Sequence, residues 1–575
     1  MRRITFLFLL FIATLMPAHA QNIGAFEPAR CPMPIPRDTV VDCGYLTVPE
    51  RHENPDGQQI ELAVAIVRAT DPNPRPDPVV YLEGGPGGSA LWGLEGWLGL
   101  DLLKSRDLIL FDQRGTGYSV PGLFCDAYEY GFDPETVETV EYETACAEAF
   151  TADGIDLGAY NSAQSAQDVA LLVEALGYAQ VNLYGISYGT RLALTVLRDQ
   201  SQIVRAAILD SPYPPNIDGY EMQALNGFNA IEAMFAACKA DVSCALAFPD
   251  LRDRFYAWVD SGDTVLSDFG DGSDFVDGYQ VVSVLFDVLY DSAAIPYVPL
   301  ALENLLSNDG FLFGDLVSGV YADDPAEQER YDALYALTDD LAMAHLGMDD
   351  YDQFLDYFDA ASEEVLLEVY DAALAEASDE DYAEVLRLHL GLDSAADLDA
   401  YLETVSDDVY DRLFDNVVSS LALGWVDVSD ADGAFNSVTC VEELHFNDRQ
   451  EAELYGLRLP STLRDSLMEG VYAQYDSCAI WGVEPAAAFE NDPVQSDLPV
   501  LVLAGQFDPI TPTTFAEAAA QSLPNAQVVT VPGAGHSVID AGDCPPSLAV
   551  AFFDNPAAPV DTSCISALTV DWVLE

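Results

Sequence analysis

Basic residues are scarce in this sequence. It has 22 lysines and arginines against 97 aspartates and glutamates, and its formal net charge is −75 at pH 7. Only Lys104 and Lys239 are lysines. Such a surface repels nucleic acid, and it repels itself unless salt screens it. The charge therefore excludes a nucleic-acid partner and indicates adaptation to a salty medium. It also favours attraction of cationic substrates, such as peptides with a free ammonium group.

Long apolar runs are missing too. The apolar stretch from Ile4 to Met16 follows Met1-Arg2-Arg3 and precedes Ala18-His19-Ala20, the pattern of a signal peptide that is cleaved before Gln21. This stretch is shorter than the roughly 20 residues that a membrane-spanning helix needs, and no later stretch reaches that length. We therefore expect residues 1–20 to be removed. The mature chain, with no membrane span, is expected to be periplasmic or secreted.

No two cysteines have the C-x-x-C spacing of a zinc site, and only His445 lies within a few residues of a cysteine. The acidic loop from Asp268 to Asp274 does not have the spacing of a calcium loop. We therefore expect no metal. The ten cysteines fit disulfides formed in an oxidising compartment. The sequence does not fix their connectivity, but pairing of neighbours closes short loops and predicts Cys31–Cys43, Cys125–Cys146, Cys238–Cys244, Cys440–Cys478 and Cys544–Cys564.

Apolar strands alternate with helices in both end regions of the chain. Strands are expected over residues 43–48, 60–67, 78–82, 108–111, 206–210, 498–504 and 527–531, and from Val181 to the turn at Gly185. Ser165 and Asp168 form a capping-box-like pair that predicts the start of a helix. This alternation is typical of a mostly parallel sheet covered by helices, in which sites form at the carboxyl ends of the strands.

The middle of the chain has a different pattern. Acidic residues are interleaved with Leu, Ala, Val and Tyr in helical stretches such as Asp332–Leu346 and Glu363–Ala377. We expect residues 213–497 to form a mainly helical acidic cap over the strand ends. Residues 21–212 and 498–575 would then be the two parts of the sheet-containing core.

The sequence Gly185-Ile186-Ser187-Tyr188-Gly189 has the G-x-S-x-G pattern of a nucleophile elbow. In such an elbow a strained serine points its hydroxyl away from the sheet, and flanking glycines let strand and helix approach closely. The following helix directs its positive end at the place where negative charge develops. Alone, this motif is only suggestive, because a Gly/Ser turn also arises by chance.

A serine nucleophile needs a base and a group that orients the base. His536 follows a predicted strand in a Gly-rich loop and is the expected base, whereas the other histidines after residue 20 lack such a context. Asp508 leaves a late strand between Ser187 and His536 in chain order, and it is favoured as the acid over Asp210. The expected oxyanion donors are the amides of Tyr188 and Gly85.

Several motifs in this order resemble one family. They are GGPGGS at Gly84, DQRGTGYS at Asp112, YGISYGT at Tyr184, GQFDPITP at Gly505 and PGAGHS at Pro532. Together they resemble the α/β-hydrolase serine peptidases of the prolyl iminopeptidase and tripeptidyl aminopeptidase group, including its secreted TAP-like members. The resemblance implies an α/β-hydrolase fold with an inserted helical cap, the triad Ser187, Asp508 and His536, and no cofactor.

The resemblance also assigns supporting roles. It implies that Arg114 buttresses the glycine loop and that cap carboxylates bind the substrate ammonium, for which Glu442 and Glu443 are the candidates. In a chain this acidic, either glutamate could equally be an ordinary solvated residue. Prolyl iminopeptidases have HGGPG where this chain has Glu83 in place of the histidine.

Three functions follow as hypotheses. The first is an exported serine aminopeptidase that acts on short peptides through an acyl-enzyme. The second is a carboxylesterase that uses the same residues on small esters. The third is a non-catalytic acidic binding protein that has kept the fold.

Overall fold

The fold is described from a computed structural model of the chain. It describes residues 23–574 except for residues 34, 37–38, 126–138, 269–272, 320–324, 349, 361–362, 393, 403–404, 406–412, 415–416, 419–420 and 422–427. The expected signal peptide, residues 1–20, lies outside the described residues. So does the middle of the acidic loop between Asp268 and Asp274.

The described residues form a nine-stranded sheet in the order β1-β2-β3-β5-β4-β6-β7-β10-β11. Its strands are β1 (Phe26–Pro28), β2 (Val41–Pro49), β3 (Gln59–Val67), β4 (Val79–Leu82), β5 (Leu108–Phe111), β6 (Val181–Ile186), β7 (Val204–Asp210), β10 (Val500–Gly505) and β11 (Ala526–Val531). The pairs β1–β2, β2–β3 and β3–β5 are antiparallel, and the others are parallel. The predicted mostly parallel sheet is confirmed.

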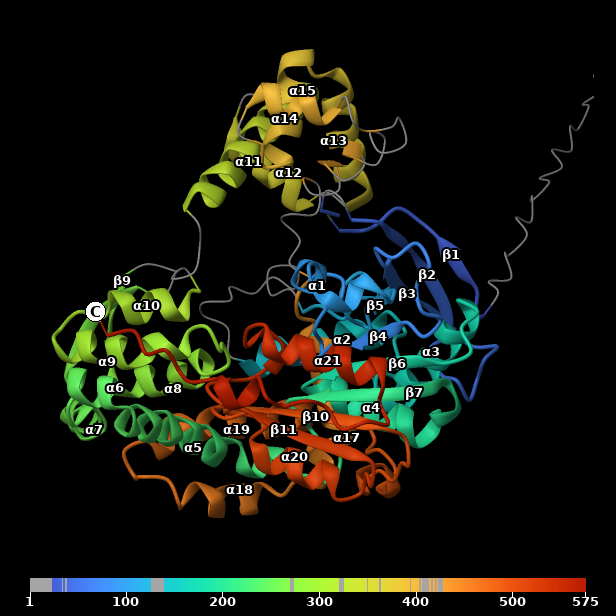
Figure 1. Cartoon of the computed structure of the whole chain (residues 1–575). Helices are drawn as coiled ribbons and strands as arrows, with labels where there is room; N and C mark the ends of the chain where they lie inside the picture. Colours follow the sequence, from blue (N-terminus) through green and yellow to red (C-terminus); the bar gives the residue numbers. More distant parts are fainter. Residues whose placement is uncertain are drawn as a thin grey trace, which may run out of the picture.

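Helices cover both faces of the sheet. Successive side chains of a strand point to opposite faces, so one strand contributes apolar side chains to both. On β3, for example, Leu62 and Val64 pack on one face while Ala63 and Ala65 pack on the other. The first face holds α3 (Ser162–Ala175), α4 (Tyr188–Asp199) and α20 (Thr513–Ala520). The second holds α1 (Leu94–Trp97) and α21 (Cys544–Asp554) (Figure 1). Another helix, α2 (Thr139–Ala152), packs against the cap helix α19.

The segment between β7 and β10 is mainly helical, with one β-hairpin. Its first group consists of α5 (Gly219–Ala240), α6 (Val242–Ala247), α7 (Leu251–Ser261), the hairpin strands β8 (Thr264–Asp268) and β9 (Ser273–Asp277), α8 (Gly278–Val288), α9 (Val298–Leu306) and α10 (Phe311–Val317). The segment ends with α17 (Asp432–Glu442), α18 (Arg449–Gly456) and α19 (Arg464–Trp481). Helices α5, α18 and α19 pack against one another beside the carboxyl ends of the strands.

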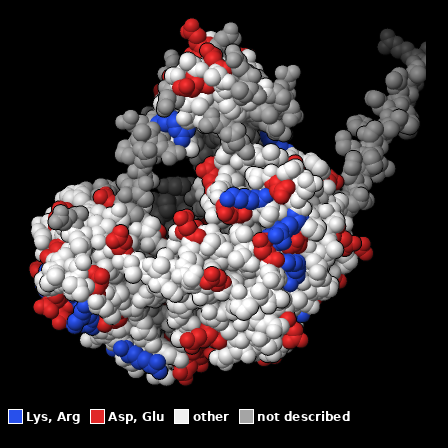
Figure 2. All heavy atoms as spheres, in the orientation of Figure 1, with Lys and Arg blue, Asp and Glu red and all other residues white. Residues whose placement is uncertain are grey.

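A second helical group stands apart in Figure 1, above the rest of the molecule. It consists of α11 (Pro325–Leu346), α12 (Tyr351–Ala360), α13 (Glu363–Glu376), α14 (Asp379–His389) and α15 (Ala395–Leu402). Buried residues such as Leu334, Phe354 and Tyr370 lie between these helices. In Figure 2, acidic side chains are scattered over the visible face and basic ones are few, as the composition requires.

All ten cysteines are paired, and the pairs are the sequence neighbours named above: Cys31–Cys43, Cys125–Cys146, Cys238–Cys244, Cys440–Cys478 and Cys544–Cys564. The Cys440–Cys478 bridge joins α17 to α19 within the cap. Across the described part of the chain, no helix is long and apolar enough to cross a membrane.

Candidate active site

Ser187 lies in a sharp turn between β6 and α4. Its φ of 56° and ψ of −124° place a non-glycine residue in a strained backbone region, as a nucleophile elbow requires. A Cβ on Gly185 would lie 2.4 Å from the Gly189 carbonyl oxygen, and one on Gly189 would lie 1.9 Å from that of Leu82. Both positions therefore need glycine. Among the described residues the Ser187 hydroxyl has no hydrogen-bond partner, so it remains open to the cavity above it.

The glycine loop after β4 lies directly against this elbow. A Cβ on Gly84 would lie 3.1 Å from the Ser187 Cβ, and Gly85 has a φ of 100° that favours glycine. The Glu83 carboxylate accepts hydrogen bonds from the Gly84 amide at 2.7 Å and from the Tyr81 hydroxyl at 2.9 Å. Burial raises the pKa of Glu83 to about 7 despite these hydrogen bonds. Glu83 thus occupies the histidine position of the HGGPG pattern and fastens the loop.

The two expected oxyanion donors belong to the glycine loop and to the residue that follows Ser187. Gly85 is exposed and lines the cavity. Tyr188 is the first residue of α4, so its amide has no intrahelical acceptor. The Tyr188 side chain points away and its hydroxyl bonds to Ser162 Oγ at 2.8 Å, which anchors the start of the helix.

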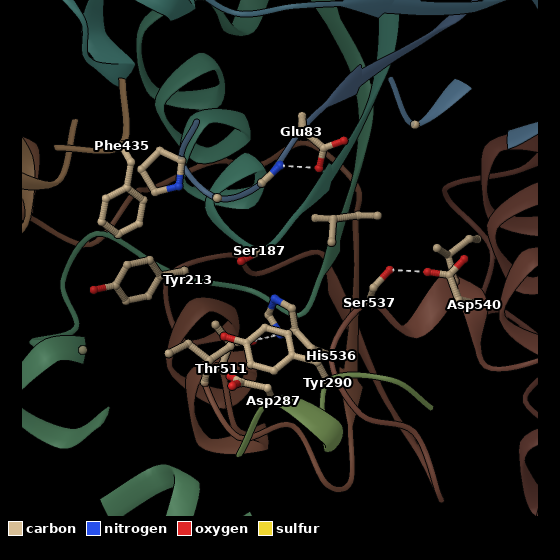
Figure 3. A pocket seen from close by; sticks show the side chains of 18 of the residues that line it. Glu83, Ser187, Tyr213, Asp287, Tyr290, Phe435, Thr511, His536, Ser537 and Asp540 are labelled. Carbon is tan, nitrogen blue, oxygen red and sulfur yellow. Dashed lines mark hydrogen bonds between the residues drawn. The ribbon is translucent and has the colours of Figure 1, made fainter. Parts of the chain in front are cut away.

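His536 lies beside Ser187 in Figure 3, and its imidazole contacts the Asp508 carboxylate. His536 Nδ1 lies 2.9 Å from Asp508 Oδ2. The same carboxylate accepts the amides of Ile510 at 3.0 Å and Thr511 at 2.8 Å, and the Thr511 hydroxyl at 2.7 Å. Burial alone would raise the pKa of Asp508, but His536 and the Thr511 donors hold it below its ordinary value. Asp508 is therefore an anion that fixes the imidazole through one nitrogen.

The alternative acid, Asp210, has a different task. Its carboxylate accepts the Tyr184 hydroxyl at 2.9 Å and the amides of Val538 at 2.8 Å and Ile539 at 2.9 Å. Burial raises its pKa to about 6. Asp210 thus holds the loop that carries His536, whereas Asp508 holds the imidazole itself.

A cavity of about 700 Å³ lies over Ser187 and His536. The core contributes the glycine loop and the residues near His536, and the cap contributes side chains from α5, α8, α17 and α19. Its lining includes aromatic residues and four carboxylates: Trp97, Tyr213, Tyr220, Tyr290 and Phe435, with Glu83, Asp287, Glu443 and Asp540. None of the described lining residues is Lys or Arg. This geometry suits a short, cationic ligand with apolar parts. The described residues contain no group of three or more His, Cys, Asp or Glu side chains that could hold a metal ion.

Comparison with known families agrees with this architecture. Residues 77–259 match the family described as alpha/beta hydrolase fold, and residues 467–564 match the family described as TAP-like protein. The chain has the α/β-hydrolase fold with a TAP-like carboxyl-terminal part.

Curated relatives of this chain include peptidases and an esterase. The chain is 30% identical over 229 residues to serine protease Hip1 of Mycobacterium tuberculosis, which is 36% of this chain and 42% of that protein. It is 30% identical over 211 residues to tripeptidyl aminopeptidase of Streptomyces lividans, 32% and 37% of the two chains. It is 31% identical over 240 residues to carboxylesterase B of M. tuberculosis, 38% and 46%. The matched region spans less than half the length of each relative.

The two cap glutamates face different surroundings. Glu442 does not line the cavity. Its Oε1 accepts the Ser162 hydroxyl at 2.7 Å and the Ser162 amide at 3.1 Å, and its Oε2 lies 3.7 Å from Arg191 Nε. Glu443 does line the cavity, is only 2% exposed, and has a buried Oε1 with no hydrogen-bond partner. The structure therefore brings Glu443, but not Glu442, to the site.

Burial raises the pKa of Glu443 to about 7. The nearby Arg191 guanidinium opposes this rise, and the second carboxylate, Glu442, adds to it. Arg191 also donates a hydrogen bond to the Glu442 carbonyl oxygen. Arg191 lies near both glutamates, so the two carboxylates share its single positive charge.

The resemblance implied that Arg114 buttresses the glycine loop, and this expectation is wrong. Its guanidinium forms a buried ion pair with Asp168 at 2.8 Å and donates to the carbonyl oxygens of Glu50 and Ala159. The neighbouring Gln113 reaches the loop instead, because its Nε2 donates to the Glu83 carbonyl oxygen at 2.9 Å. Asp112, the first residue of the same DQRGTGYS motif, accepts a hydrogen bond from the hydroxyl of Ser89, which lies just after the glycines.

Sequence reasoning missed two supports of the candidate base. Thr511 bonds Asp508, and its position three residues later in GQFDPITP is a local turn signal that could have been used. Tyr290 lies two residues after the end of α8. Its carbonyl oxygen accepts a hydrogen bond from the His536 amide at 3.0 Å, and its ring centre lies 4.9 Å from that of the imidazole. No local pattern links a cap tyrosine to a histidine so distant in sequence.

Proposed function

We propose that this protein is a serine peptidase that cleaves short peptides from their free amino end. The observation that supports this most directly is Glu443, a buried carboxylate with an unpartnered oxygen in the wall of the cavity that Ser187 and His536 also line. A carboxylate in that state favours a ligand that brings a positive charge and hydrogen-bond donors. A peptide amino terminus has both.

In the proposed mechanism, Ser187 Oγ attacks the scissile carbonyl carbon while His536 Nε2 takes its proton. Asp508 keeps the imidazole in the required tautomer through Nδ1. The amides of Tyr188 and Gly85 stabilise the oxyanion. His536 then gives its proton to the leaving amine as the C–N bond breaks. A water molecule, activated by the same imidazole, hydrolyses the acyl-enzyme and regenerates Ser187.

The cap restricts the substrate in this proposal. Helices α5, α8, α17 and α19 enclose the space over Ser187, so a short peptide enters and a folded protein does not. The buried Glu443 then binds the substrate ammonium at a fixed place relative to the nucleophile. Fixing that end determines which peptide bond lies at Ser187.

We also propose that the protein is exported. The signal-peptide pattern of residues 1–20 and the pairing of all ten cysteines support an oxidising destination. Amino-terminal sequencing of the protein recovered outside the cytoplasm should begin near Gln21. Recovery with Met1 intact would argue against cleavage.

The test of the peptidase proposal uses p-nitroanilides of one, two and three alanines, each with a free and with an N-acetylated amine. We expect turnover of at least one free-amine anilide and a loss of about 100-fold in kcat/KM on acetylation, because the charge and its donors vanish. A fluorophosphonate probe should label the protein at the same time.

Carboxylesterase activity is the second candidate, favoured by the similarity to carboxylesterase B and by the aromatic cavity lining. If p-nitrophenyl butyrate turns over far faster than every free-amine anilide, and acetylation changes nothing, the esterase is the better assignment. If no substrate turns over and the probe does not label, the non-catalytic binding protein is favoured.

A further inference from the structure

The active-site cavity extends from Ser187 in two directions, and one of them leads away from the cap. In Figure 3, Tyr213 and Phe435 lie on one side of Ser187, whereas Ser537 and Asp540 lie on the other. We call the part on the second side the core arm, because residues of the sheet-containing core line it. These residues are Gly93, Gly96, Trp97, Leu100, Ile539 and Asp540.

The wall of the core arm is apolar and firmly held. The ring centre of Trp97 lies 4.4 Å from that of Tyr81 and 5.3 Å from that of Tyr184. The Tyr184 hydroxyl donates to the Asp210 carboxylate, which also accepts the Ile539 amide at 2.9 Å. Trp97 is 6% exposed and Ile539 is 7% exposed, so both are packed on their other sides and present an apolar surface to the cavity.

Two glycines of the core arm are not required by the backbone. Gly93 has a φ of −77°, and Gly96 lies within α1 without a positive φ. A Cβ on Gly96 would meet no atom within 4 Å, and one on Gly93 would lie 3.8 Å from its nearest neighbour. Because glycine is a poor helix former, neither conformation nor packing accounts for these two residues. Their missing side chains keep the core arm open.

The proposed reaction assigns a part of the substrate to each direction. Glu443 binds the amino end in the cap, so the acyl part of the peptide lies on the cap side of Ser187. The leaving group then lies on the opposite side. His536 gives its proton to the leaving amine, and Ile539 and Asp540, which line the core arm, follow His536 closely in the chain. The core arm therefore lies next to the group that protonates the leaving amine.

We propose that the core arm binds the leaving group, and that it selects a large apolar side chain on the residue directly after the scissile bond. This inference rests on the proposed peptidase function. Trp97, Leu100 and Ile539 would cover such a side chain, and burial of a leucine or phenylalanine side chain favours binding. Gly93 and Gly96 determine the width of the arm and therefore the size of the side chain that fits.

The experiment extends the best alanine peptide by one residue, which is glycine, alanine, leucine or phenylalanine, and follows its release by chromatography. The carboxyl end is amidated, which keeps a further negative charge away from Glu83 and Asp540 in the cavity wall. We expect kcat/KM to be about tenfold or more higher for release of phenylalanine than for release of glycine.

In Gly96→Leu this ratio of phenylalanine to glycine should fall by about tenfold, because the new side chain occupies the arm. Leucine is a better helix former than glycine, so α1 should tolerate the change. A ratio within one variant does not depend on how much of that variant is folded.

Two matched variants locate the effect. Glu95→Leu adds the same side chain at the neighbouring position of α1, outside the cavity lining, and its ratio should equal that of the wild type. Gly470→Leu changes a glycine of α19 that also lines the cavity and whose Cβ would meet no atom within 4 Å. It should alter the preference for the acyl part and leave the ratio of phenylalanine to glycine unchanged.

A wild-type ratio near one would overturn the leaving-group pocket while the peptidase stands. A ratio that changes in Gly470→Leu but not in Gly96→Leu would place the leaving group in the cap and overturn it as well. If esters turn over but no peptide does, the peptidase proposal fails, and the pocket is tested with benzyl and methyl butyrate. An equal ratio of these esters in the wild type and Gly96→Leu would then overturn the pocket. Absence of all turnover would overturn both proposals.

Discussion

The two sides of the active-site cavity differ in how fully their polar groups are paired. On the core side, Asp508 and Asp210 each accept at least three hydrogen bonds from protein groups. On the cap side, Glu443, Gln223 and Gln474 each keep a buried oxygen without a partner. The polar groups on the core side are thus already paired, and in the proposed reaction the substrate supplies the missing partner on the cap side. This contrast separates the residues that should affect kcat from those that should affect KM.

Asp508→Asn should have the largest effect, a loss of about 10⁴-fold in kcat, because the imidazole would lose the group that fixes its tautomer. Asp210→Asn is the matched variant on the neighbouring strand. It keeps the shape of a carboxylate that holds the Val538 and Ile539 amides, so we expect a lower melting temperature and a loss in kcat of less than about 100-fold. Both variants are measured with the same ester and the same peptide.

A result in which Asp210→Asn loses as much kcat as Asp508→Asn, with its fold intact, would contradict this assignment. It would move the role of the acid from the strand β10 loop to the end of β7.

Glu443→Gln and Glu442→Gln compare two adjacent residues in the cap. Glu443→Gln should raise KM for free-amine anilides by about 10- to 100-fold, which is the value of a hydrogen bond to a charged group. Its effect on an uncharged ester should be small. Glu442→Gln should instead destabilise the protein by about 1–3 kcal/mol, because it removes one of the two carboxylates that neutralise the buried Arg191 and weakens the acceptor of the Ser162 hydrogen bonds.

Urea unfolding and peptide kinetics on both variants distinguish these outcomes. If Glu442→Gln raises KM while its unfolding free energy stays at the wild-type value, the two roles are reversed.

The dependence of activity on pH should also distinguish the cap side of the cavity from the core side. The raised pKa of Glu443, about 7, means that its carboxyl is neutral below this pH and attracts an ammonium above it. The ratio of peptide to ester kcat/KM should therefore rise about fivefold between pH 6 and pH 7, and fall above about pH 8 as the substrate amine loses its proton. Because His536 acts on both substrates in the proposed mechanism, its contribution cancels in this ratio. In Glu443→Gln the rise should vanish, and a persistent rise would assign it to another group.

The smallest effect concerns the surface. The net charge of −75 makes the chain repel itself, so salt should stabilise the protein by screening this repulsion. We expect the melting temperature to rise by roughly 5 °C between 0.1 and 1 M sodium chloride, a small change for a domain of this size. Ester turnover, which depends on paired groups in the core, should change little. A melting temperature that falls with salt would contradict the predicted adaptation.

The fold was predictable because its signals are local. Strands such as β3 and β6 are mostly apolar, and their observed bounds lie within a residue or two of the predicted ones. The start of α3 was predicted at Ser165, but the helix begins at Ser162 with Asn161 as its cap. Asp168 looked like a capping residue, yet its carboxylate pairs with Arg114 and His52, a tertiary contact that no local pattern reveals.

The candidate site was predictable only in part, for the same reason. The elbow and the strand-end loops have short motifs, so Ser187, Asp508 and His536 could be named from spacing. Glu442 and Glu443 could not be separated, because α17 ends at Glu442 and the backbone turns at the next residue, which sends the two side chains in different directions. The roles of all these candidate residues in the reaction stay predictions. The hairpin β8–β9 and the short edge strand β1 were also not predicted, because both lack an apolar run.

The central claim is that Ser187 is the nucleophile in a site assembled at the carboxyl edge of the sheet. The most direct measurement is mass-spectrometric mapping of the adduct that a fluorophosphonate forms with the intact protein. We predict one adduct, on the peptide that contains Ser187, absent from Ser187→Ala and strongly slowed in His536→Ala. An adduct on another serine, or labelling that persists in Ser187→Ala, would contradict the account.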